Sequence, residues 1–229
     1  MSYKWWLLIA ICLFGVGAGL GIGLAFGVSL SAAIADLLQQ NLDAIKELSA
    51  AVVPFKVSTA VFIFFKNISA LLLSFVFSPF FCFLPILALV LNGGLLSFVS
   101  VFMIQEKSLG FLLAGLLPHG IFELPALIIG EAAALSFGAM VIMLLVRKES
   151  RNSLISIVKQ SSWHVLLTLV LLLITGIFPA IILLAFLREQ TRAILLPNLK
   201  QNLRYLAIAC ILLVPAAVIE TYITPLFLQ

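Results

Sequence analysis

Long runs of apolar residues constrain the fold of this chain more than any other feature. A helix needs about 20 mainly apolar residues to cross the hydrocarbon core of a bilayer. Runs of this length or longer occupy residues 5–27, 57–104 and 110–146. The sequence is 64% hydrophobic and 10% charged, whereas soluble domains average about 45–50% apolar and about 25% charged. Because such a chain cannot cover a surface with polar groups, we predict an all-α, polytopic protein of the plasma membrane.

We predict about five to six hydrophobic segments and one amphipathic surface helix, all in a single transmembrane domain of residues 1–229. The amphipathic helix is expected at about 30–52, where apolar residues recur at helical spacing among charged ones. The apolar run that begins at residue 57 is too long for one span and is divided near Ser78-Pro79. Lys66 favours an alternative for its first part, an interfacial helix followed by a span from Asn67. The predicted segments are 5–27, 57–78, 80–104, 110–146 (broken), 163–187 and 205–228.

The distribution of basic residues indicates the orientation of these segments. Lys4 precedes the first span, so the N-terminus is expected in the cytoplasm. A cleaved signal peptide is the alternative, although its apolar region would usually be shorter. Two basic stretches at 147–163 and 188–204, which we predict to be loops, flank the segment 163–187. A single crossing would put one of them outside, and a re-entrant hairpin at 176–179 would keep both inside. We expect both termini on the cytoplasmic side.

Glycines are concentrated in the first hydrophobic segment. Gly15, Gly19, Gly23 and Gly27 stand four residues apart, and Gly17 and Gly21 repeat this spacing. Such spacing lets the backbone of another helix approach closely. We therefore predict that this helix packs against another helix, as a homo-oligomer or with partner membrane proteins.

His119 and Glu123 are polar residues within an otherwise apolar run. A charge in a membrane segment costs about 2.5–3.5 kcal/mol on insertion scales, which favours either a functional role or hydrogen bonds to neighbouring helices. The two residues are four apart, hence one turn apart on one helix face, and Zn²⁺ accepts both ligand types. A divalent metal such as zinc is therefore a possible cofactor, with Glu131 and Glu220 as the available extra carboxylates.

Two prolines flank this pair. Pro118 and Pro125 each remove a helix hydrogen bond. The pattern predicts a broken or re-entrant helix around 116–126, as found at transporter binding sites. The alternative is a kinked helix that enters at the interface.

Other classes of function have little support in the sequence. The motifs HExxH, GxSxG and the Walker loop are absent. The net charge of +4 comes from basic residues between the hydrophobic segments, so nucleic acid is not an expected partner. Each of the three cysteines lies alone in an apolar run, and no disulfide framework is indicated.

Four sequence pieces, in order along the chain, resemble the stage II sporulation protein M family. The piece "LPHGIFELPA" at 117–126 looks like its signature. The pieces "FKNISA" at 65–70, "LNGG" at 91–94 and "PAAVIETYITP" at 215–225 are similar to further family elements. The resemblance covers about residues 57–225.

The resemblance implies a multi-pass membrane protein of a family spread through bacteria and archaea. Its sporulation members work with cell-wall-degrading partners during engulfment. The family's polar set falls on Asn67, Asn92, His119, Gly120, Glu123 and Glu220, while Glu131 sits where the family more usually has a small residue.

Three functions are compatible with these residues. The first is a non-enzymatic component of a membrane complex, in which Asn67, Asn92, His119, Glu123 and Glu220 form one polar cluster that holds helices together or binds a cation. The second is an ion or small-solute transporter or channel that uses His119 and Glu123. The third and most remote is an intramembrane hydrolase.

Overall fold

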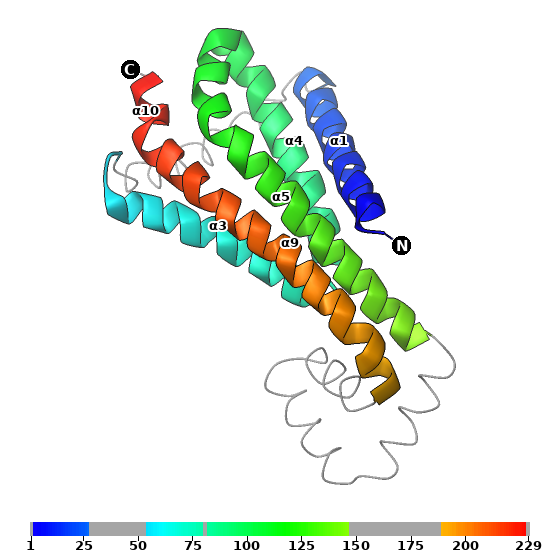
Figure 1. Ribbon diagram of the computed structural model, residues 1–229. Coiled ribbons are helices and arrows are strands. Elements are labelled where there is room, and N and C mark those ends of the chain that lie inside the picture. Colours follow the sequence, from blue (N-terminus) through cyan, green and yellow to red (C-terminus); the bar gives the residue numbers. More distant parts are fainter. Residues whose placement is uncertain (1, 28–53, 80–81, 147–188, 228–229) are drawn as a thin grey trace, which may run out of the picture.

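The structure, a computed structural model, describes residues 2–27, 54–79, 82–146 and 189–227, and every regular element in these ranges is a helix (Figure 1). Five of the described helices are long and apolar enough to cross a membrane, which confirms the all-α, multi-pass prediction. The predicted segments 30–52 and 163–187 lie outside the described residues. The helices are α1 (Tyr3–Gly27), α3 (Val57–Phe77), α4 (Phe83–Glu106), α5 (Leu109–Val146), α9 (Glu189–Tyr222) and α10 (Thr224–Phe227).

The boundary between α3 and α4 lies where the sequence predicts it. Helix α3 ends at Phe77, directly before Ser78-Pro79. Pro85 stands in the first turn of α4, where a missing N–H costs no helix hydrogen bond. Helix α3 also continues through Lys66 without interruption, so the alternative of two separate segments meeting at Asn67 is wrong.

Helix α5 is continuous, which corrects the prediction of a broken or re-entrant helix at 116–126. Pro118 and Pro125 both lie inside its 38 residues. Each proline removes one backbone hydrogen bond, and packing against neighbouring helices allows the helix to continue. The ribbon changes direction in the N-terminal part of α5 (Figure 1), as a proline kink would produce.

Helix α9 begins well before the predicted span at 205–228. It starts at Glu189 and therefore includes most of the stretch predicted as a basic loop. Leu195 and Asn202 are buried, whereas Lys200 and Arg204 are exposed. Lys200 and Arg204 thus lie on the exposed face of a helix whose other face packs in the core, and the prediction of a loop here is wrong.

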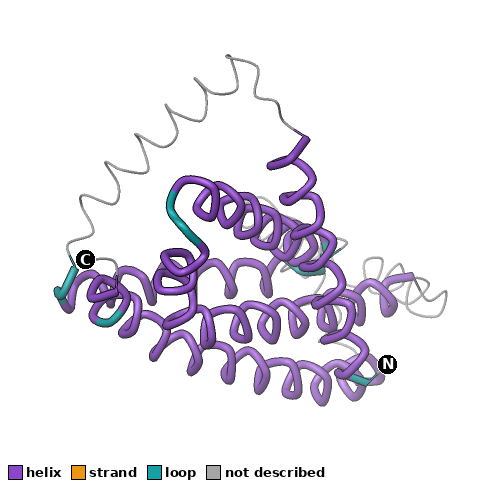
Figure 2. Tube along the Cα trace, turned by 90° about the horizontal axis from the view of Figure 1, so that it is seen from above, coloured by secondary structure: helices purple, strands orange, loops and turns teal. Residues whose placement is uncertain are grey.

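The five long helices form two groups that share α5, and Figure 2 shows the described helices from above. Helix α1 packs chiefly on α4, and α9 packs chiefly on α5, with α3 beside both α5 and α9. The larger apolar core lies in the second group, where the stacked rings of Phe75 and Phe137 have centroids 4.9 Å apart. The smaller core joins α1, α4 and α5 around Ala10, Leu89 and Ala132.

The helix directions place the chain termini at opposite ends of the bundle (Figure 1). Tyr3, at the start of α1, donates a hydrogen bond to the carbonyl of Ile129 in the middle of α5 (2.8 Å), while Thr224 lies beside His119 near the start of α5. The side of the membrane on which each terminus lies stays a prediction. The end of α5 and the start of α9 lie at the same end of the bundle, a condition that the re-entrant alternative for 163–187 requires.

Close helix packing uses one of the two predicted glycine rows. A Cβ atom on Gly17 would collide with the carbonyl of Val90, and one on Gly21 would collide with the carbonyl of Gly94. The backbones of α1 and α4 therefore touch directly, as the spacing predicts.

The other glycine row does not take part in this contact. A Cβ atom on Gly15, Gly19 or Gly23 would meet nothing within 4 Å. The packing of this row against another helix, with Gly27 as its last member, stays a prediction. If it occurs, the partner helix lies outside the described part of the chain.

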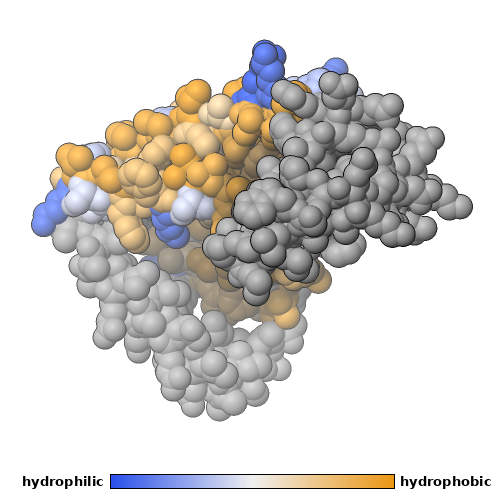
Figure 3. Space-filling model, turned by 90° about the horizontal axis from the view of Figure 1, so that it is seen from below, coloured by the Kyte–Doolittle hydropathy of each residue, from blue (hydrophilic) through white to orange (hydrophobic). Residues whose placement is uncertain are grey.

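The described residues on the face seen in Figure 3 are largely apolar. Large side chains on every long helix are exposed, among them Leu20, Phe65 and Leu95. Exposed apolar area on this scale is stable in lipid and not in water, which fits association with a bilayer.

Candidate functional site

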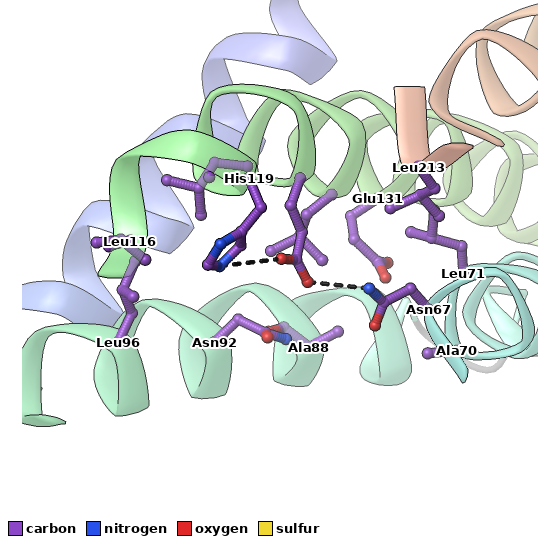
Figure 4. Close-up of a pocket in the computed structure, with 14 residues that line it drawn as sticks. Asn67, Ala70, Leu71, Ala88, Asn92, Leu96, Leu116, His119, Glu131 and Leu213 are labelled. Carbon is purple, nitrogen blue, oxygen red and sulfur yellow. Dashed lines mark hydrogen bonds and ion pairs between the residues drawn. The ribbon is translucent and has the colours of Figure 1, made fainter. Parts of the chain in front are cut away.

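A cavity of about 260 Å³ lies among α3, α4, α5 and α9 (Figure 4). Apolar side chains and small residues make up most of its wall. Five polar residues also line it, and the sequence analysis had singled out all of them: Asn67, Asn92, His119, Glu123 and Glu131.

A chain of polar contacts runs along one side of this cavity. The Asn67 amide donates a hydrogen bond to Glu123 Oε1 across α3 and α5 (3.0 Å). Glu123 Oε2 lies 3.9 Å from His119 Nε2, which is within ion-pair reach but too long for a direct hydrogen bond. On its other side, His119 Nδ1 shares a hydrogen bond with the Thr224 hydroxyl (3.2 Å). The contacts therefore link α3, α5 and α10.

A second polar pair joins the same two helices further along. The Ser74 hydroxyl donates a hydrogen bond to the Glu131 carboxylate, and both side chains are buried. Ser74 follows Asn67 by seven residues and Glu131 follows Glu123 by eight, which is two helical turns in each case. The α3–α5 interface thus carries two polar pairs, which we call the outer pair (Asn67–Glu123) and the inner pair (Ser74–Glu131).

Two of the predicted cluster residues contact the others less directly. The Asn92 amide donates to the carbonyl of Ala88 in its own helix (2.8 Å), although its side chain lines the cavity. Glu220 is not among the lining residues, but it lies close enough to Glu123 and Lys66 for electrostatic interaction. The structure therefore brings Asn67, His119 and Glu123 together and leaves Asn92 and Glu220 at the edge of the cluster.

The described residues do not complete a transition-metal site. His119 and Glu123 form a pair, but no group of three or more His, Cys, Asp or Glu side chains in the described ranges is arranged to hold an ion. Zinc in proteins normally has at least three protein ligands. The side chains present therefore do not fit the expected zinc site, because Glu131 is bonded to Ser74 instead.

Ser74 and Thr224 are site residues that the sequence analysis missed. Thr224 belongs to the quoted piece at 215–225, and Ser74 stands two turns after Asn67 on the same helix face. Both signals are weak, because hydroxyl groups in helices often bond to their own backbone. Thr221 does so here, with Ala217 as acceptor (2.8 Å).

Comparisons with known proteins agree with the resemblance of these motifs. The family model described as stage II sporulation protein M matches residues 10–183. The match includes the first helix, which the quoted motifs do not, and it ends before the piece at 215–225. Searches of curated proteins and of solved structures gave no match. The family match covers most of the sequence and contains the cavity residues from Asn67 to Glu131, so the chain belongs to the stage II sporulation protein M family.

Proposed function

We propose that this chain is a non-enzymatic component of a membrane complex, in which the polar cluster fixes the register of the helices. The observation that supports this most strongly is the pair of hydrogen bonds between α3 and α5. Within the described ranges, no buried side-chain nitrogen or oxygen lacks a hydrogen-bond partner. Hydrogen bonds of this kind hold helices together, and the groups that form them then have a structural role.

The proposed contact with the rest of the complex is the open glycine row on α1. Gly15, Gly19 and Gly23 leave the helix backbone uncovered, and a second transmembrane helix can approach such a row closely. The partner is a second copy of this chain or another membrane protein.

The test is the mass of the protein after gentle solubilisation, measured for the wild type and for Gly19→Leu. We expect a stable oligomer or hetero-complex that Gly19→Leu dissociates, since leucine would hold the partner helix away. Leu20→Ile is the matched control, because Leu20 is an exposed apolar residue of the same helix. A wild-type protein that stays monomeric and without a partner at every concentration would contradict the proposal.

Transport of an ion or small solute is the second candidate, and the cavity favours it. His119 and Glu123 could relay a proton along the cavity wall, with Glu220 as a nearby carboxylate. Proton or cation flux in liposomes that Glu123→Gln abolishes would support transport. A stable complex without flux would favour the scaffold. The closeness of His119 and Glu123 also meets the geometric requirement of the hydrolase alternative, which stays a prediction.

A further inference from the structure

The cavity presents an unequal set of hydrogen-bonding groups. The amide nitrogen of Asn67 donates to Glu123, and that of Asn92 donates to its own helix. His119 Nδ1 is engaged by Thr224. Each amide nitrogen keeps a second N–H, and His119 Nε2 is a donor or an acceptor according to its tautomer, but acceptors outnumber donors, because two amide oxygens and two carboxylates line the cavity.

The charges around the cavity have the same bias. Two carboxylates, Glu123 and Glu131, line it, and among the described residues that line it none is lysine or arginine. Lys66 is the cation in electrostatic reach, and it acts on Glu220, which is not a lining residue. A cavity with spare acceptors and negative charge favours a ligand that carries donors and positive charge.

The remaining wall limits the ligand further. Leucines from α3, α4, α5 and α9 form much of the remaining, apolar wall. The volume of about 260 Å³, compared with about 30 Å³ for each water in the liquid, suits a molecule of fewer than roughly ten non-hydrogen atoms. A bare transition-metal ion would use neither the leucines nor the acceptors beyond the single His–Glu pair.

We propose that this cavity binds a small organic cation with a primary ammonium group and a short apolar body. The ammonium has three donors and no acceptor, and it lies beside the carboxylate of Glu123 with the apolar body against the leucines. This assignment rests on the cavity alone, so it holds for a scaffold as well as for a transporter.

The test is direct binding of propylammonium to the purified full-length protein in detergent, by calorimetry and by thermal unfolding. Propan-1-ol and propionate are the matched probes, because they keep the apolar body and replace the cation by a neutral group or an anion. Sodium chloride at equal concentration controls for ionic strength. We expect binding and stabilisation by propylammonium only. Equal binding of all three organic probes, or of none, would overturn the proposal.

Variants locate the bound cation. Glu123→Gln should weaken binding at least tenfold, since a hydrogen bond to a charged group is lost, and Glu131→Gln, two turns further along α5, should weaken it less. Glu149→Gln, in the predicted loop at 147–163, is the matched control and should bind as the wild type does.

Because the carboxylate variants remove contacts that hold α3 on α5, Ala88→Leu provides a second test. It fills the cavity from α4, leaves both carboxylates in place and should also abolish binding; undiminished binding to folded Ala88→Leu would refute this location.

Discussion

Alanine substitution should destabilise the protein at Gly21 and not at Gly19, although the two residues lie on one helix and two positions apart. A Cβ atom on Gly21 would collide with the carbonyl of Gly94 and the hydroxyl of Ser97, both on α4. A Cβ atom on Gly19 would meet nothing within 4 Å. The same methyl group therefore collides with another backbone at one position and enters open space at the other.

The expected magnitudes follow from these contacts. Overpacking costs about 1–3 kcal/mol, and a backbone carbonyl cannot rotate out of the way as a side chain can. Moving α1 off α4 also weakens the hydrogen bond from Ser97 Oγ to the carbonyl of Ala18 (2.8 Å), which contributes about 1 kcal/mol. The higher helix propensity of alanine compared with glycine offsets up to about 1 kcal/mol of this loss. Gly21→Ala should therefore lower the free energy of unfolding by about 1–3 kcal/mol, and Gly19→Ala should leave it unchanged or raise it by up to about 1 kcal/mol.

The assay is reversible unfolding in mixed micelles with increasing SDS, followed by tryptophan fluorescence. Trp6 packs against the core that joins α1 to the bundle, so its emission reports the contact in question. Gly23→Ala, at another open position, is a second control. Equal destabilisation by Gly19→Ala and Gly21→Ala, or a neutral Gly21→Ala, would refute the direct backbone contact of α1 with α4. Because Gly19 belongs to the proposed partner-binding row, the mass of each variant is measured as well.

Three further predictions concern the interior of the bundle. Glu123→Leu should destabilise the protein by about 1–2 kcal/mol, because the Asn67 amide loses its acceptor, whereas Glu149→Leu in the predicted loop should change little. In the double variant Asn67→Leu/Glu123→Leu the two losses should not add; additive losses would contradict a direct pair. Elemental analysis should find no stoichiometric transition metal, and a metal lost in His119→Ala would reverse this conclusion. Burial raises the pKa of the Cys82 thiol to about 11, so alkylation of a protein with Cys82 as its single cysteine should be slow at neutral pH. Its rate should then rise about tenfold per pH unit towards that pKa, and equal rates in folded and SDS-unfolded protein would contradict the burial.

The helices were largely predictable because lipid imposes a simple rule on the sequence. A bilayer requires long apolar helices, so α1, α3 and α4 begin and end close to the predicted boundaries. The errors lie where tertiary packing overrides local signals. Pro118 and Pro125 suggested a break that neighbouring helices prevent, and the charges near Lys200 suggested a loop where only one helix face is exposed.

The site was predictable to the extent that its residues are ionisable groups with a high free-energy cost in a membrane. His119 and Glu123 were identified because an ionisable group in an apolar run costs free energy on insertion into a membrane. Their spacing placed them on one helix face. Asn67 entered through the family resemblance, and its bond to Glu123 is a tertiary contact that local spacing does not reveal. Ser74 and Thr224 gave little signal because hydroxyl groups can satisfy themselves locally, as Ser100 does with the carbonyl of Leu96 (2.6 Å).

The two polar pairs also help to fix the register in which α3 and α5 pack. From the outer to the inner pair, the chain advances by seven residues on α3 and by eight on α5, which is about 11–12 Å along either axis. Equal advances of the same sign require the two helices to run parallel. An antiparallel arrangement would place Glu131 opposite Asn67 and would leave Ser74 to pair with Glu123. A shift by one turn would separate both carboxylates from their donors and leave them unpaired in an apolar interior, at a cost of about 1–3 kcal/mol for each lost partner. The close packing of Leu71 on Gly130 favours the same register, so apolar and polar contacts act together, and α3 then holds α5 where His119 and Glu123 face the cavity.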